Sequence, residues 1–234
     1  MLRDAPAFRR FVLFGVLFGF AANCIGPFFN VFMLDTLQMP ISALTWLVVI
    51  ASVTSALSLP AWGMMLDRFG NKPVMVFTLV AWMLPGYFWV FAEPGRTWML
   101  YPMWAWGGLI SSGFLLGSFN LLLKLVPPEA KTISISIHVG ATALAAAVAP
   151  ILGGSMLDLF RALEVEPLRL LHWTSVVHHT AVIATALVLH SVVEPKSTTL
   201  RQVVGAMRSY RQIGALLGVS FLVQHTFLKR DEDR

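Results

Sequence analysis

Six long apolar stretches separated by short polar breaks run through most of the chain. A helix that crosses the hydrocarbon core of a bilayer needs about 20 mostly apolar residues, and each stretch meets that length. The stretches are roughly Phe8–Leu34, Ile41–Leu66, Pro73–Ala92, Thr97–Leu123, Thr132–Leu157 and Leu170–Val193. Each run is continuous rather than alternating, which excludes a transmembrane β-barrel. The pattern therefore predicts an all-α membrane protein with six transmembrane helices.

The composition supports this prediction and narrows the possible partners. Only 12% of the 234 residues are charged, with a mean hydropathy of +0.73, whereas soluble domains carry about 25% charged residues. The net charge of +5 is spread through loops and tail rather than gathered in a basic domain, so we expect no nucleic-acid partner. The one cysteine, Cys24, excludes an internal disulfide and a cysteine-based metal cluster.

The lysines and arginines predict how the chain is oriented in the membrane. Of the 17 basic residues, 14 fall on one side of the predicted spans, and the three on the other side are Arg96, Arg161 and Arg169. Basic residues concentrate in cytoplasmic loops. We therefore expect a multi-pass protein of the plasma (inner) membrane with both termini in the cytoplasm.

The chain after the last span follows a different pattern. Apolar residues recur there at helical spacing, at Leu200, Val203, Val204, Met207 and Tyr210. Residues 199–228 are expected to form an amphipathic helix on the cytoplasmic leaflet, with a seventh span as the alternative. The predicted domains are a transmembrane domain over residues 1–196 and a cytoplasmic tail over residues 197–234, which carries the interfacial helix.

A sequence motif occupies the break between the second and third spans. It reads G-x-x-x-D-R-x-G-x-K and consists of Gly63, Asp67, Arg68, Gly70 and Lys72. Gly63 would allow helices to approach closely, Gly70 would permit a tight turn, and the charges can pair with neighbouring helix ends. The motif resembles the loop signature of the major facilitator superfamily, where it helps to hold the two halves of a transporter in one conformation. An ordinary charged cytoplasmic loop is the alternative.

An internal repeat supports the same resemblance. Pro60-x-x-Gly63 near the end of the second span recurs as Pro150-x-x-Gly153 in the fifth, three helices later. By the predicted orientation the two copies lie at opposite sides of the membrane. A six-helix half of this family contains a three-helix unit repeated upside down. We therefore expect two inverted three-helix repeats.

Further features are similar to the C-terminal half of the family. The segment 8–11 (FRRF) leads into a span with Asn23 and Pro27, which resembles the seventh helix of bacterial members. The P-x-x-G-G of residues 150–154 resembles their eleventh helix. The N-terminal halves of proton-coupled family members commonly carry an arginine in the middle of their fourth span, and this chain has none there. The chain thus resembles the C-terminal six-helix half, with the N-terminal half as the alternative.

The resemblance implies transport of a small solute across the membrane by alternating access, with this chain as one half of a secondary transporter. Residues 1–196 would form the half-transporter domain. The complementary six-helix half would be encoded upstream in the same gene or in an adjacent gene, or a second copy would supply it in a homodimer. A truncated or inactive transporter fragment is the alternative.

The resemblance also ranks the residues that could contact the substrate. In this family the first and fourth helices of a half line the central cavity, with the second and fifth alongside, and the third and sixth face lipid. The resulting candidates are Asn23, Asn30, Trp104, Trp106, Asn120 and His138. Asparagines equally join helices, and tryptophans anchor helix ends. His178 and His179 fall on the sixth span and are expected to be peripheral.

The chemistry of the spans limits the substrate and the reaction. No charged residue lies at the centre of a span, which favours a neutral or amphipathic solute. An intramembrane serine protease built on Ser111 or Ser112 with a distant histidine is a remote alternative, because the flanking glycine pattern is missing. We expect no enzyme activity, no nucleotide-binding loop, no metal site and no cofactor.

Overall fold

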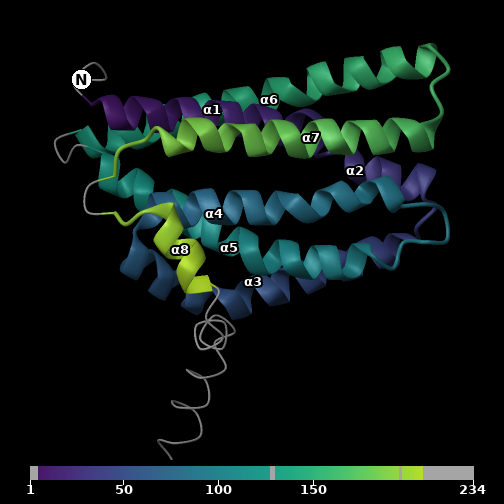
Figure 1. The fold of residues 1–234 in the computed structure, drawn as a ribbon. Helices are drawn as coiled ribbons and strands as arrows, with labels where there is room; N and C mark the ends of the chain where they lie inside the picture. Colours follow the sequence, from purple (N-terminus) through teal and green to yellow (C-terminus); the bar gives the residue numbers. More distant parts are fainter. Residues whose placement is uncertain (1–4, 127–129, 195–196, 208–234) are drawn as a thin grey trace, which may run out of the picture.

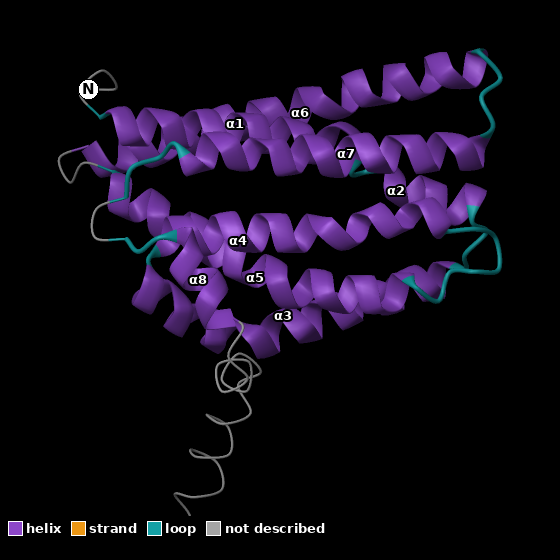
Figure 2. Cartoon of the chain, in the orientation of Figure 1, coloured by secondary structure: helices purple, strands orange, loops and turns teal. Residues whose placement is uncertain are grey.

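The computed structural model describes residues 5–126, 130–194 and 197–207, and this part of the chain is helical without a named strand (Figures 1 and 2). The longer elements are α1 (Pro6–Ile25), α3 (Ile41–Phe69), α4 (Asn71–Met83), α5 (Leu100–Leu125), α6 (Lys131–Ala162) and α7 (Pro167–His190). The shorter ones are α2 (Phe28–Val31), the π-helix η1 (Phe32–Thr36), the 3-10 helix η2 (Leu84–Phe91) and α8 (Leu200–Met207).

Two of the predicted spans are interrupted near prolines. The first span divides into α1, α2 and η1, and the break falls at Gly26 and Pro27. The third span changes from the α-helix α4 to the 3-10 helix η2 at Leu84, directly before Pro85. Proline has no backbone N–H to donate and clashes with the preceding turn, which explains why regular hydrogen bonding changes at these positions.

Five helical stretches of the described residues are long and apolar enough to cross a membrane. They are Pro6–Thr36, Ile41–Phe69, Asn71–Phe91, Leu100–Leu125 and Lys131–Ala162. These five correspond to the first five predicted spans. The sixth, α7, has 24 residues and runs along the bundle, but it carries several polar side chains, including two adjacent histidines (Figure 1). Its crossing of the membrane stays a prediction.

The helices pack in a regular arrangement. α1 packs against α6 and α7, α3 packs against α5, and α4 packs against both α5 and α7. α4 and α7 therefore lie side by side and join the α1–α6 pair to the α3–α5 pair (Figure 1). Only 17% of the most apolar window of α3 and 6% of that of α6 is buried, against 44% for α4 with η2. Within this chain the third span is thus among the better buried helices, and the second and fifth present the open faces.

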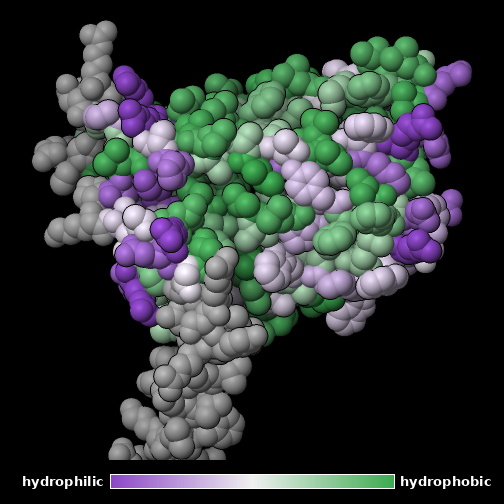
Figure 3. All heavy atoms as spheres, in the orientation of Figure 1, coloured by the Kyte–Doolittle hydropathy of each residue, from purple (hydrophilic) through white to green (hydrophobic). Residues whose placement is uncertain are grey.

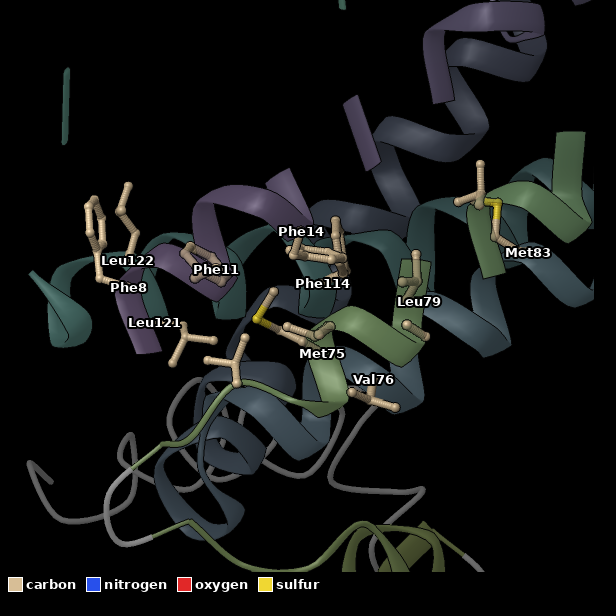
Figure 4. Packing of buried hydrophobic residues seen from close by; sticks show 14 of the residues in the cluster. Phe8, Phe11, Phe14, Met75, Val76, Leu79, Met83, Phe114, Leu121 and Leu122 are labelled. Atoms are coloured by element: carbon tan, nitrogen blue, oxygen red, sulfur yellow. The ribbon is translucent and has the colours of Figure 1, made fainter. Parts of the chain in front are cut away.

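Side chains from α1, α4, α5 and α7 form one of the hydrophobic clusters, shown in Figure 4. Phe11 and Phe14 of α1 lie with ring centroids 5.9 Å apart, and Phe14 meets Phe114 of α5 edge-on at 6.2 Å. Met75 and Leu79 of α4 are fully buried beside them. Because lipid gives no net hydrophobic drive for helices to associate, such close packing is the main source of cohesion in the bundle.

The first part of the tail packs on the end of the bundle. α8 contacts α4, and Val203 is fully buried in a cluster with Trp62, Phe69 and Val74. α8 coincides with the start of the predicted amphipathic helix, and residues 208–234 lie outside the described part of the chain. The face of the molecule shown in Figure 3 is mostly hydrophobic over its middle and hydrophilic at both ends, as expected for a protein that lies across a bilayer.

Candidate functional site

A cavity of about 520 Å³ opens between the end of α1 and the elements α2, α3, α4, η2, α5 and α7. Its lining combines apolar residues with aromatic, amide, hydroxyl and imidazole side chains, and among the described residues no Asp, Glu, Lys or Arg contributes to it. Its volume falls in the range of about 300–1,000 Å³ that is usual for small-molecule sites. The polar and aromatic lining residues are Phe29, Asn30, Ser52, Ser55, Trp82, Trp89, Trp104, Ser111, His178 and His179.

An aromatic cluster forms one wall of the cavity. The rings of Phe29 and Trp89 stack with centroids 4.9 Å apart, and Trp104 meets Trp89 edge-on at 5.8 Å. These contacts join α2, η2 and α5, three elements that are far apart in the sequence. Offset and edge-on aromatic pairs are the favoured geometries, so this wall is a fixed surface for an apolar group.

The two adjacent histidines of α7 form another part of the lining, next to Phe29 of the aromatic wall. His179 donates from Nδ1 to the carbonyl oxygen of Ser175 at 2.6 Å, and its ring lies directly against Gly86 of η2, where any side chain would overlap it. The ring of His178 meets Phe29 edge-on at 5.2 Å. The prediction that these histidines are peripheral is wrong for this cavity, because Gly86 lets α7 approach η2 closely.

Two of the six residues predicted to contact substrate line this cavity, namely Asn30 and Trp104. The other four are not in its lining. Asn23 donates to the carbonyl of Gly19 one turn earlier at 2.8 Å, and Trp106 donates to the carbonyl of Ala81 at 2.7 Å, which joins α5 to α4. Their contact with substrate stays a prediction.

His138 and Asn120 lie elsewhere on the helices. The His138 ring stacks on Phe11 at 4.9 Å, and α6 meets α1 there so closely that a side chain at Gly15 would come within 2.7 Å of His138 Cε1. Nδ1 of His138 is buried without a partner among the described residues. Asn120 is half-buried near the far end of α5. Neither contributes to the cavity lining.

A second polar site lies at the end of the bundle that holds the sequence motif. The Glu194 side chain, which has no exposed surface, accepts from the backbone N–H of Lys72 at 2.7 Å and from that of Asn71 at 3.1 Å. It also accepts from Nζ of Lys124 at 2.9 Å and from Nδ2 of Asn71 at 2.8 Å. The first turn of a helix has N–H groups without intrahelical partners, and here a carboxylate from beyond α7 satisfies two of them for α4.

These contacts decide the charge state of Glu194. Burial by itself raises the pKa of the carboxyl, but the hydrogen bonds from Lys72, Lys124 and Asn71 outweigh it, so the pKa lies below its ordinary value. Hydrogen bonds to the charged form favour ionisation. The interaction of Glu194 with Lys124 was not predicted from the sequence. The sequence signal for it was the acidic residue directly after the last apolar stretch.

Two of the motif residues, Gly70 and Lys72, adjoin this charged cluster. Gly70 has φ +92°, a conformation that favours glycine, so the predicted tight turn is confirmed. Lys72 donates from Nζ to the carbonyl of His190 at 3.4 Å, and the guanidinium of Arg68 lies 5.1 Å from the Phe69 ring centroid. Asp67 is exposed at the end of α3. The predicted close approach at Gly63 does not occur within the described residues, because an added Cβ there would meet no atom within 4 Å.

The serines considered for a protease have other partners. Ser111 donates to the carbonyl of Gly108 at 3.4 Å, and Ser112 shares a 2.7 Å hydrogen bond with Ser58 of α3. Within the described residues neither is hydrogen-bonded to a histidine, and no group of three His, Cys, Asp or Glu side chains is placed to hold a metal ion.

Comparison with known families gives one match. A sequence model described as Major Facilitator Superfamily matches residues 11–228, which is most of the chain. Comparison with curated proteins and with solved structures gives no match.

Proposed function

Because this chain belongs to the Major Facilitator Superfamily, we propose that it supplies one half of a secondary transporter that moves a small solute by alternating access. Members of the family are transporters rather than enzymes. The proposal rests on the cavity of about 520 Å³. Its walls combine residues from the first predicted span, such as Phe29, with residues from the last, such as His178. A neutral or amphipathic solute suits this lining best, since it contains no charged side chain.

We propose that α7 is the sixth span and that the domain, residues 1–196, consists of two inverted three-helix repeats. The packing supports this layout. In two inverted repeats, α1, α3 and α4 would be equivalent to α5, α6 and α7, respectively. The contact of α1 with α6 is then equivalent to that of α5 with α3, and the contact of α1 with α7 is equivalent to that of α5 with α4. All four contacts are present. Pro60 of α3 and Pro150 of α6 occupy matching places in the two repeats.

We further propose that a complementary six-helix half covers the open faces of α3 and α6. These are the least buried of the five membrane-long stretches, and Gly63 of α3 has open space before it. The partner would come from the same gene upstream, from an adjacent gene or from a second copy. As part of the same proposal, this chain corresponds to the C-terminal half of the family. It lies in the plasma membrane with both termini in the cytoplasm. An inactive fragment is the competing hypothesis.

Cysteine accessibility tests alternating access. In a Cys24→Ser background, single cysteines are placed at Ser52 and Ser55 in the cavity wall, with Ser155→Cys on the exposed face of α6 as the control. Cells and inverted vesicles that express the chain with its natural neighbours are treated with a membrane-impermeant maleimide. The proposal expects the cavity cysteines to be labelled from both sides of the membrane and the control from neither. Labelling of the cavity cysteines from one side alone supports an inert fragment.

A further inference from the structure

The hydrogen-bonding state of the cavity limits what can bind there. Ser52 donates its hydroxyl proton to the carbonyl of Val48 at 2.8 Å, and Ser111 donates to that of Gly108. A hydroxyl has a single proton, so once that proton bonds the helix backbone only oxygen lone pairs remain for a ligand. These two serines therefore present acceptors to the cavity.

His178 presents an acceptor that is more deeply buried. Its side chain is 8% exposed, and Nδ1 has no partner among the described residues. The carbonyl of Ala21 interacts with the ring, and because Nδ1 has no partner this interaction falls to Nε2, to which we assign the proton. The neutral ring then carries a lone pair at Nδ1. A buried acceptor without a partner destabilises the empty cavity, and a donor on a ligand would satisfy it.

The neighbouring histidine has its acceptor in a different place. His179 donates its Nδ1 proton to the Ser175 carbonyl, which leaves the lone pair on Nε2, and that atom lies directly against Gly86 of η2. The N–H donors available in the lining are the indoles of Trp82, Trp89 and Trp104 and the amide of Asn30, all of them neutral. A buried carboxylate or phosphate would find no counter-charge among these residues, which makes its desolvation costly.

We infer that the cavity takes an amphipathic solute whose apolar, preferably aromatic, part lies against the Phe29–Trp89–Trp104 wall and whose N–H or O–H group donates to Nδ1 of His178. Anions are excluded. The inference rests on the proposed function and adds to it a substrate class and a specificity-determining residue.

Four ligands that share one ring test the inference on the full chain in lipid nanodiscs. Phenethyl alcohol and phenylacetamide are neutral and carry a donor, phenethyl methyl ether lacks one, and phenylacetate is an anion. Equilibrium binding is measured with radiolabelled phenethyl alcohol and displacement by the others. The alcohol and the amide should bind saturably, the ether about fivefold more weakly and phenylacetate more than tenfold more weakly. The fivefold step corresponds to about one hydrogen bond. Equal binding of ether and alcohol, tight binding of phenylacetate, or no saturable binding of the alcohol overturns the inference.

His178→Phe locates the donor contact. The phenyl ring retains the edge-on contact with Phe29 but has no acceptor, so affinity for the alcohol should fall about fivefold while that for the ether stays unchanged. His172→Phe, six residues earlier on α7 and outside the lining, is the control. An equal loss for ether and alcohol contradicts the assigned hydrogen bond. If His178→Phe does not fold, the four-ligand series on the unmodified chain decides.

The two proposals fail differently. Two-sided labelling of the cavity cysteines together with tight binding of phenylacetate leaves transport standing and removes the substrate class. One-sided labelling together with a preference for the alcohol that requires His178 removes transport and leaves the binding assignment.

Discussion

The Glu194 carboxylate accepts the backbone N–H of Lys72 at 2.7 Å, although 122 residues separate them in the sequence. This contact joins the segment after α7 to the first turn of α4. Thr198 continues the connection with two hydrogen bonds to the carbonyl of Phe69, at 2.7 and 2.9 Å. The end of the membrane domain is therefore held to the loop that carries the family motif.

Removing the Glu194 side chain should destabilise this end of the bundle. Glu194→Ala leaves two backbone N–H groups and Lys124 without their acceptor, at an expected cost of about 2–3 kcal/mol, whereas Glu194→Gln retains one acceptor oxygen and should cost less. Thermal unfolding in detergent measures both. Asp158→Asn is the control, because its ion pair with Arg161 is exposed and 3.8 Å long. Equal stability of Glu194→Ala and the parent chain would contradict the assignment.

The same carboxylate predicts how stability depends on pH. Its pKa in the folded chain lies below the ordinary value, so its contribution is complete above that ordinary value and is lost as the pH falls through the folded pKa. The stability difference between the parent chain and Glu194→Gln should therefore be constant near neutral pH and shrink on acidification. Thermal unfolding of both proteins across pH 7 to pH 3 measures that difference. A difference that grows on acidification would show that the sign is wrong.

Two glycines of α6 should respond in opposite ways to alanine. A side chain at Gly153 would overlap the backbone carbonyl of Cys24 in α1, so Gly153→Ala must separate the two helices, at about 1–3 kcal/mol. Among the described residues no atom lies within 4 Å of a Cβ added at Gly140, so Gly140→Ala should be neutral or stabilising by about 0.5–1 kcal/mol through helix propensity. Unfolding midpoints compare the pair. Similar midpoints for both variants would contradict the close α1–α6 contact.

Gly63 distinguishes packing inside the chain from packing against a partner. Gly63→Ala meets open space here, so the isolated chain should keep its unfolding midpoint. If the complementary half covers α3, the same variant should reduce co-purification of that half from native membranes. Gly205→Ala, also in open space but on α8, is the matched control. Reduced stability of the isolated chain with Gly63→Ala would contradict the open environment found for this residue.

The sequence by itself determined the helical class, the first five membrane stretches and the turn at Gly70. Each depends on local properties: the length of an apolar run, the absence of a proline N–H, or the freedom of glycine at positive φ. These properties act over a few neighbouring residues, so they can be read without knowing which helices meet.

The tertiary structure alone decided which side chains share a site. Asn30 and Trp104 reach the cavity, while Trp106, only two residues after Trp104, points to the Ala81 carbonyl on another face of α5. His178 enters the lining because Gly86 admits α7 against η2, and Glu194 finds Lys72 because the ends of α7 and α4 meet. In lipid these contacts depend on how the surfaces of the helices fit together, and the pattern of apolar residues along the sequence does not predict that fit.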